Sequence, residues 1–318
     1  MKVGIFDLDD NLLTRRAIGE RKGKNIFIEL LRFILVCGIS WFLGVLVSTI
    51  GIIIYTYLTG NINRFLSGDL EIINDPVMLL MILILTGIIS IIVILVSVRI
   101  EKRSIYTLGF VSKDWAKEYF KGLGIGFLII SLVVLINLLT GSVKWDGFMD
   151  TVNGRGVSYG LLVGYFISAV ILGIGEELLF RGYLCIGISR KSPMFVATII
   201  SSIIFAGYNL IGFDISINLI LPLLNLFLLG IFLTIYMVKR GSIWSVAGIN
   251  LMWFFAPYSI YGVDEHSIGK IDSIFEISIT EGRELLNGGQ YGIQGSIITT
   301  IVLIISLFIV LKMKSKRG

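Results

Sequence analysis

The sequence predicts an all-α polytopic membrane protein with about eight transmembrane helices. Its 318 residues are 55% hydrophobic and only 15% charged, and the mean hydropathy is +0.91. The charges gather in short clusters between long apolar runs, which is typical of chains that cross a bilayer several times. Each run has about the length that crosses a bilayer. The runs lie at roughly 33–58, 76–98, 122–143, 157–175, 193–213, 215–238, 241–260 and 291–311.

The basic residues predict the orientation, because lysine and arginine near the ends of spans are retained in the cytoplasm. With eight spans, alternate loops divide the 27 basic residues into 22 on one side and 5 on the other. We therefore expect both termini in the cytoplasm and the protein in the cell membrane of a prokaryote. Acidic residues fall mainly on the predicted outer side, at Asp69, Glu71, Asp75, Asp146, Asp150, Asp214 and in the 261–290 loop.

The charge balance and the cysteines do not indicate a second domain or a nucleic-acid partner. The net charge of +5 and the pI near 9.1 follow from the topology, so they do not indicate nucleic-acid binding, and membrane lipid is the expected partner. We expect residues 1–25 to form a cytoplasmic N-terminal tail and residues 26–318 a single membrane domain. Cys37 and Cys185 are the only cysteines and offer no disulfide framework.

One charged cluster, Glu176, Glu177 and Arg181, lies inside an apolar run. Ionisable groups at membrane depth are costly unless they are paired, and they often mark functional sites. On a helix Glu177 and Arg181 are four residues apart and can pair, whereas Glu176 is rotated about 100° away. We therefore expect a structural role for Glu177 and a chemical one, as general base, for Glu176. The alternative is that both acids only lock helices together.

Two asparagines are expected near Glu176. The tight turn at 190–193 joins the fourth and fifth spans. Glu176 precedes this turn and Asn209 follows it by similar numbers of residues, so the helical rise of about 1.5 Å per residue places them at similar depth. Asn250 enters the membrane from the same side in the seventh span, and the three side chains can form a polar cluster. Asparagine in a membrane helix also commonly serves as a contact between helices.

These residues resemble a known family. The CPBP membrane proteins, named for CAAX proteases and bacteriocin-processing enzymes, include the type II CAAX prenyl endopeptidases. Three motifs mark this family: Glu-Glu-x-x-x-Arg, Phe-x-x-x-His, and a later His-x-x-x-Asn element that follows Gly-Ser-x-Trp. The first motif is intact here as Glu176, Glu177 and Arg181. The resemblance covers about 120–255 and implies a CAAX-protease-like helical bundle.

The second and third motifs are altered. Asn209 replaces the histidine that should follow Phe205, and Asn250 and Phe254 replace the histidine and asparagine of the third motif. In active relatives the first glutamate and the second-motif histidine prepare a water, and the third-motif pair steadies the oxyanion. The resemblance thus implies catalytic positions at Glu176, Glu177, Arg181, Asn209 and Asn250. An asparagine can orient a water but cannot accept its proton, and phenylalanine forms no such hydrogen bond.

We expect no cofactor and no metal ion. Zinc favours three or four nitrogen, sulfur or carboxylate ligands, whereas this cluster offers two acids and two amides, so a zinc enzyme is not predicted. The sole histidine, His266, falls in the predicted outer loop, away from the cluster.

Two functions from different classes follow. The first is an intramembrane endopeptidase-like protein with weakened catalysis, acting on a peptide, a CAAX-type tail or a bacteriocin precursor that enters from the cytoplasmic side. The second is a non-catalytic pseudoprotease, which binds a peptide or a membrane protein partner in immunity or regulation. A proton-coupled transporter that uses Glu176 is a more remote alternative. The substitutions at Asn209, Asn250 and Phe254 leave open whether the chain is an active enzyme.

Overall fold

A computed structural model describes residues 25–67, 76–110, 114–148, 157–211, 217–263 and 273–315. Of the predicted N-terminal tail, only residue 25 falls within these ranges, and His266 lies outside them. The longer helices are α2 (Ile26–Leu58), α4 (Pro76–Ile100), α5 (Trp115–Leu139), α7 (Tyr159–Glu177), α9 (Met194–Asn209), α10 (Ile220–Arg240), α11 (Trp244–Phe255) and α13 (Ile297–Lys312). Short helices are α3 (Ile62–Leu66), α8 (Ile186–Ser189) and α12 (Glu284–Asn287).

The predicted all-α polytopic membrane fold is confirmed, but the count of eight spans is not. Within the described ranges, five helices are long and apolar enough to cross a membrane. They are Ile26–Leu58, Leu80–Ile100, Trp115–Leu139, Tyr159–Ser189 and Ile220–Arg240. The other three predicted runs contain the shorter helices α9, α11 and α13. The protein is thus an integral membrane protein in which long and short apolar helices pack together.

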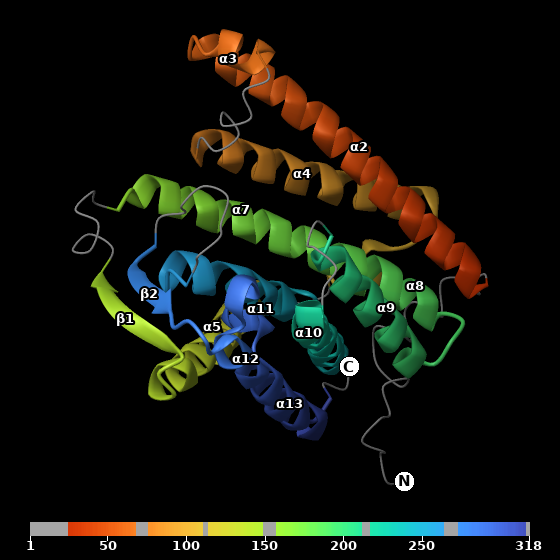
Figure 1. The fold of residues 1–318 in the computed structure, drawn as a ribbon. Coiled ribbons are helices and arrows are strands. Elements are labelled where there is room, and N and C mark those ends of the chain that lie inside the picture. Colours follow the sequence, from red (N-terminus) through yellow and green to blue (C-terminus); the bar gives the residue numbers. More distant parts are fainter. Residues whose placement is uncertain are drawn as a thin grey trace.

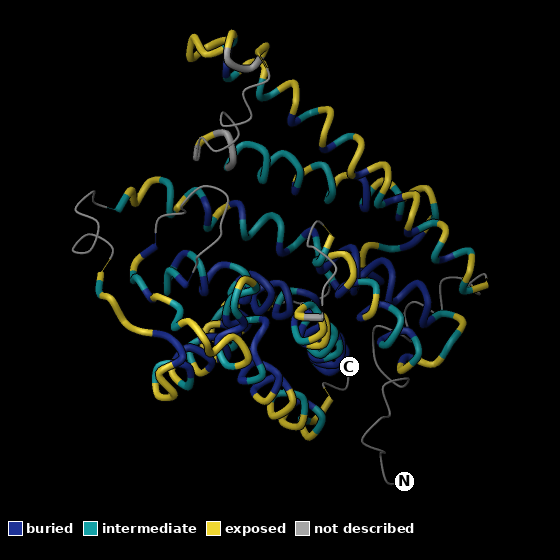
Figure 2. Tube along the Cα trace, viewed as in Figure 1, coloured by how far each residue is buried: buried dark blue, intermediate teal, exposed yellow. Residues whose placement is uncertain are grey.

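The helices form successive layers (Figure 1). Helix α2 packs on α4, α4 on α7, α7 on α11, and α11 on α5, while α10 packs on α9 and α13. Buried residues concentrate where the later helices meet, and the outer face of α2 is mostly exposed (Figure 2). That face carries large apolar side chains such as Ile34, Trp41 and Phe42. It suits contact with lipid chains.

Glycines allow α5 and α11 to approach closely. A Cβ at Gly122 would lie 2.0 Å from the carbonyl oxygen of Ser245, and one at Gly248 would lie 2.5 Å from that of Tyr119. Contacts this short have no room for a side chain, and small residues are the usual means of close helix packing in membranes. The two helices therefore meet backbone to backbone, which fixes the position of α11.

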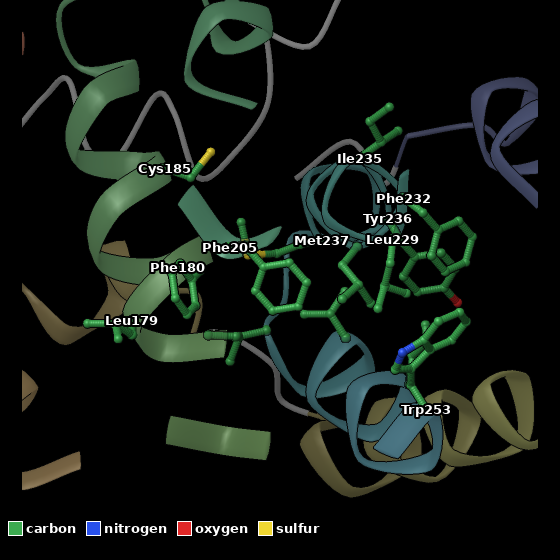
Figure 3. Packing of buried hydrophobic residues seen from close by; sticks show 14 of the residues in the cluster. Leu179, Phe180, Cys185, Phe205, Leu229, Phe232, Ile235, Tyr236, Met237 and Trp253 are labelled. Atoms are coloured by element: carbon green, nitrogen blue, oxygen red, sulfur yellow. The ribbon is translucent and has the colours of Figure 1, made fainter. Parts of the chain in front are cut away.

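A π-helical segment, η3 (Leu178–Cys185), continues α7 into the core. Every residue of this segment is buried. Phe180 meets Phe205 of α9 with ring centroids 5.3 Å apart (Figure 3). A second π segment, η5 (Ala256–Ile260), continues α11. Such segments are rare and often occur at functional sites.

A two-stranded antiparallel sheet is present that the sequence analysis did not predict. Strand β1 (Val143–Phe148) pairs with β2 (Phe275–Ile279), and the register is irregular between Trp145 and Gly147. The sheet lies at one pole of the molecule and α8 at the other (Figure 1). Its β-branched and aromatic residues suit strands, but the pairing joins segments far apart in the sequence. Short 3₁₀ turns complete the fold: η2 (Ile105–Leu108), η4 (Ile217–Leu219), η6 (Gly289–Tyr291) and η7 (Ile293–Gly295).

The glycine contact between α5 and α11 gives a direct test. We expect Gly122→Ala to lower the free energy of unfolding by about 1–3 kcal/mol, because the added methyl overlaps the backbone of α11. The matched control is Gly124→Ala on the same helix, where no atom lies within 4 Å of the new Cβ. This control should be neutral or should stabilise the helix by up to about 1 kcal/mol. Thermal unfolding in detergent micelles measures both, and equal midpoints for the two variants would contradict the packing.

Candidate active site

Glu177 and Arg181 form a fully buried ion pair. The Nη1 of Arg181 lies 2.9 Å from Oε1 of Glu177, and the side chains are 1% and 0% exposed. The guanidinium also lies 4.0 Å from the ring centroid of Phe205, which is a favourable cation–π distance. The ion pair joins η3 to α9 inside the core. The sequence predicted this pairing, although it did not predict the π-helical turn that carries the arginine.

Glu176 points away from this pair and meets α11. The Nδ2 of Asn250 donates a hydrogen bond of 2.9 Å to Oε2 of Glu176. Asn250 is fully buried, and its Oδ1 has no hydrogen-bond partner among the described residues. Gly173 lies where α7 packs on α11, and a Cβ there would lie at an ordinary contact distance of 3.5 Å from the carbonyl oxygen of Ala247. The glutamate and the asparagine are thus held together by close helix packing.

A cavity of about 310 Å³, which we call the central cavity, contains both groups. Asn209, the last residue of α9, also lines it, and its Nδ2 donates a hydrogen bond of 3.0 Å to the carbonyl oxygen of Phe205. Phe254 lines the cavity one helical turn after Asn250. The structure therefore brings Glu176, Asn209 and Asn250 to one space. Glu177 and Arg181 are not among its lining residues.

Several hydroxyl groups in the central cavity were not predicted. Tyr165, Ser168, Tyr258 and Ser259 line it beside apolar side chains. The hydroxyl of Tyr258 donates a hydrogen bond of 3.0 Å to Gln294. These residues carry no motif and are common in membrane helices, so no pattern in the sequence separates them from packing residues.

The central cavity lies near those helix ends that carry few basic residues. Leu83 lines it from the second turn of α4, and Asn209 from the last turn of α9. Basic residues occupy the opposite ends, such as Arg99 in the last turn of α4 and Lys239 and Arg240 in that of α10. The basic residues of these helices thus lie at the ends away from the central cavity.

The donor set of the cavity does not suit zinc. Its lining includes one carboxylate, two amides and hydroxyl groups. No group of three or more histidine, cysteine or acidic side chains occurs in the described parts of the chain. Amide side chains are poor substitutes for the nitrogen and sulfur ligands of zinc. The absence of a cofactor stays a prediction.

The comparison with known families agrees with this geometry. Residues 158–256 match the family model described as type II CAAX prenyl endopeptidase Rce1-like. This segment is CAAX-protease-like. The resemblance expected from the sequence is therefore confirmed over α7, η3, α9, α10 and α11, which include Glu176, Asn209 and Asn250. A comparison with curated proteins finds no match.

The ion pair of the CAAX-protease-like segment can be tested separately from its chemistry. Arg181→Met leaves the Glu177 carboxylate buried without its cation, and we expect it to lower the free energy of unfolding by about 3–5 kcal/mol. The double variant Glu177→Gln with Arg181→Met removes both charges, and we expect it to lower the free energy of unfolding much less. Unfolding in detergent micelles compares the two. A double variant as unstable as the single one would show that the charge pairing is not what holds η3.

Proposed function

We propose that the protein is a CAAX-protease-like intramembrane protein that binds a peptide in the central cavity and hydrolyses it weakly. Glu176 would act as the single acid–base group. The observation that carries the proposal is the Glu176–Asn250 contact at the wall of a cavity large enough for a ligand. A carboxylate oriented by a neighbouring amide is suited to take a proton from an attacking water.

Asn250 could contribute through its amide group. An amide N–H stabilises a developing oxyanion without changing its own protonation state. Its Oδ1 is buried and has no hydrogen-bond partner among the described residues. The Nδ2 group, which already orients the Glu176 carboxylate, supports a role beside the peptide bond.

The altered motif positions support the weakened chemistry. Asn209 can orient a water but cannot accept its proton, and Phe254 cannot donate a hydrogen bond. Loss of one acid–base partner commonly lowers a rate by about 10²–10⁴-fold. Binding without cleavage, as in a pseudoprotease, is the second candidate. This candidate is favoured because Phe254 stands at the cavity wall, where the family motif has an asparagine that can form hydrogen bonds.

We also propose that residues 26–318 form one membrane domain in a prokaryotic cell membrane, with both termini in the cytoplasm. The basic ends of α4 and α10 support this orientation. The central cavity would then open toward the outer half of the bilayer. A peptide substrate or partner is expected to reach it from that side.

Cleavage assays test the chemistry. We expect purified protein in lipid to cleave membrane-tethered peptides slowly, and Glu176→Gln to abolish that cleavage because no other carboxylate lines the described cavity wall. Asn209→His combined with Asn250→His should raise the rate by about 10²-fold or more, because a second proton acceptor returns. A native rate that Glu176→Gln leaves unchanged would exclude Glu176 as the base. Peptide binding without cleavage by the native protein would favour the pseudoprotease.

Cysteine labelling tests the orientation. In a background with Cys37→Ala and Cys185→Ala, we expect Glu281→Cys to react with a membrane-impermeant maleimide in intact cells. Lys191→Cys should react only after permeabilisation. Both native side chains are exposed, so access to the reagent depends on the side of the membrane. The reverse labelling pattern would place the central cavity on the cytoplasmic side.

A further inference from the structure

A smaller cavity of about 140 Å³, which we call the side chamber, adjoins the central cavity. Asn209, Phe254 and Tyr258 line both spaces. The side chamber is also lined by the first turns of α10, by the loop 288–295, and by Leu210, Trp253, Val263 and Ile279. The same three side chains border both spaces, so the two cavities lie side by side.

The loop 288–295 is a wall made largely of backbone. Gly288, Gly289 and Gly292 have φ angles of 84°, 53° and 63°, a region that favours glycine. A Cβ at Gly288 would lie 1.8 Å from the carbonyl oxygen of Gly292, so the turn leaves no room for another residue. Gly289, Gly292 and Gly295 line the side chamber, and a glycine can do so only with backbone atoms. The N–H groups of these three glycines already donate hydrogen bonds within the loop, so the wall is a closed turn of fixed shape.

Amide side chains fix this wall in place. Gln294 donates a hydrogen bond to the carbonyl oxygen of Trp253 and accepts one from the hydroxyl of Tyr258. Asn225 of α10 donates to the carbonyl oxygens of Gln294 and Ser296, at 2.8 and 2.9 Å. These bonds tie the loop to α10, α11 and η5. The side chamber is thus preformed, which lowers the entropic cost of binding.

The walls of both cavities carry almost no charged side chains. No lysine or arginine is present among the described residues that line either cavity, and Glu176 is the only carboxylate. The side chamber presents amides, phenol groups and backbone to its contents. Such groups complement the N–H and C=O groups of an uncharged peptide chain. A charged group placed there would lose its hydration without gaining a counter-charge.

We propose that the two cavities form one continuous cleft for an uncharged, extended, internal stretch of a peptide, in which the side chamber holds the residues next to those at Glu176. This inference rests on the proposed function and narrows its substrate class. A free C-terminal carboxylate in either space would lack a cation from the described walls, so the cleft disfavours a chain terminus. The occupant is a peptide that continues beyond the site.

A peptide-length experiment tests the cleft. The full-length protein in lipid nanodiscs is titrated with fluorescent peptides of Ala, Leu, Ser and Gln, with capped N-termini and C-terminal amides. The short peptide has about four residues and the long one about eight, which spans about 26 Å when extended. We expect the long peptide to bind at least about tenfold more tightly. Leu226→Trp, which fills the side chamber, should remove this gain and leave the affinity for the short peptide unchanged.

The matched control is Leu224→Trp on the same helix, an exposed position that does not line the side chamber, and it should keep the gain. The long peptide with a free C-terminal carboxylate should bind about tenfold more weakly than its amide. The proposal is overturned if Leu226→Trp leaves the length dependence intact, or if the carboxylate peptide binds as tightly as the amide. Binding of the short peptide reports separately on the central cavity. If the native protein does not bind the short peptide, that result counts against the proposed function.

Discussion

The hydrogen bond between Asn250 and Glu176 is the contact on which the site depends, because it joins the two helices that face each other across the central cavity. That bond requires α11 to lie at one depth and at one distance from α7. Gly122 and Gly248 set the position of α11 against α5, and α7 also packs on α11. In a membrane, where apolar side chains gain little by leaving lipid, such close packing and polar contacts hold helices together. The site is therefore part of the packing of the bundle.

Two adjacent glutamates serve different purposes because the helix turns between them. Glu177 points into the core and is neutralised by Arg181, which also packs on Phe205. Glu176 points to a cavity and has an amide as its neighbour. A buried ion pair contributes little net stability, but removal of one partner is costly, so the pair constrains η3 more than it stabilises the protein. Rigidity beside the cavity keeps the Glu176 carboxylate in one orientation.

The sequence was sufficient for the features that depend on helical geometry alone. The turn at 190–193 and the helical rise were enough to place Glu176 and Asn209 at similar depth, and Asn250 was found by the same reasoning. The pairing of β1 with β2, the π-helical turns and the loop 288–295 depend on contacts between distant segments, which periodicity does not report. The side from which a peptide enters depends on the orientation of the protein in the membrane, which stays a proposal. The tail at 1–25 stays a prediction.

Under the proposed function, the substitutions at the motif positions change the chemistry of the site more than its capacity to bind. Asparagine is smaller than histidine and keeps hydrogen-bond donors and acceptors, so Asn209 and Asn250 keep the cavity polar while removing proton exchange. Gln294, Tyr258 and the glycine backbone extend the same neutral polarity into the side chamber. A cleft lined in this way can hold peptide groups whether or not the bond beside Glu176 is broken. In the proposed function, peptide binding would therefore depend on the whole cleft, whereas hydrolysis would depend on one carboxylate.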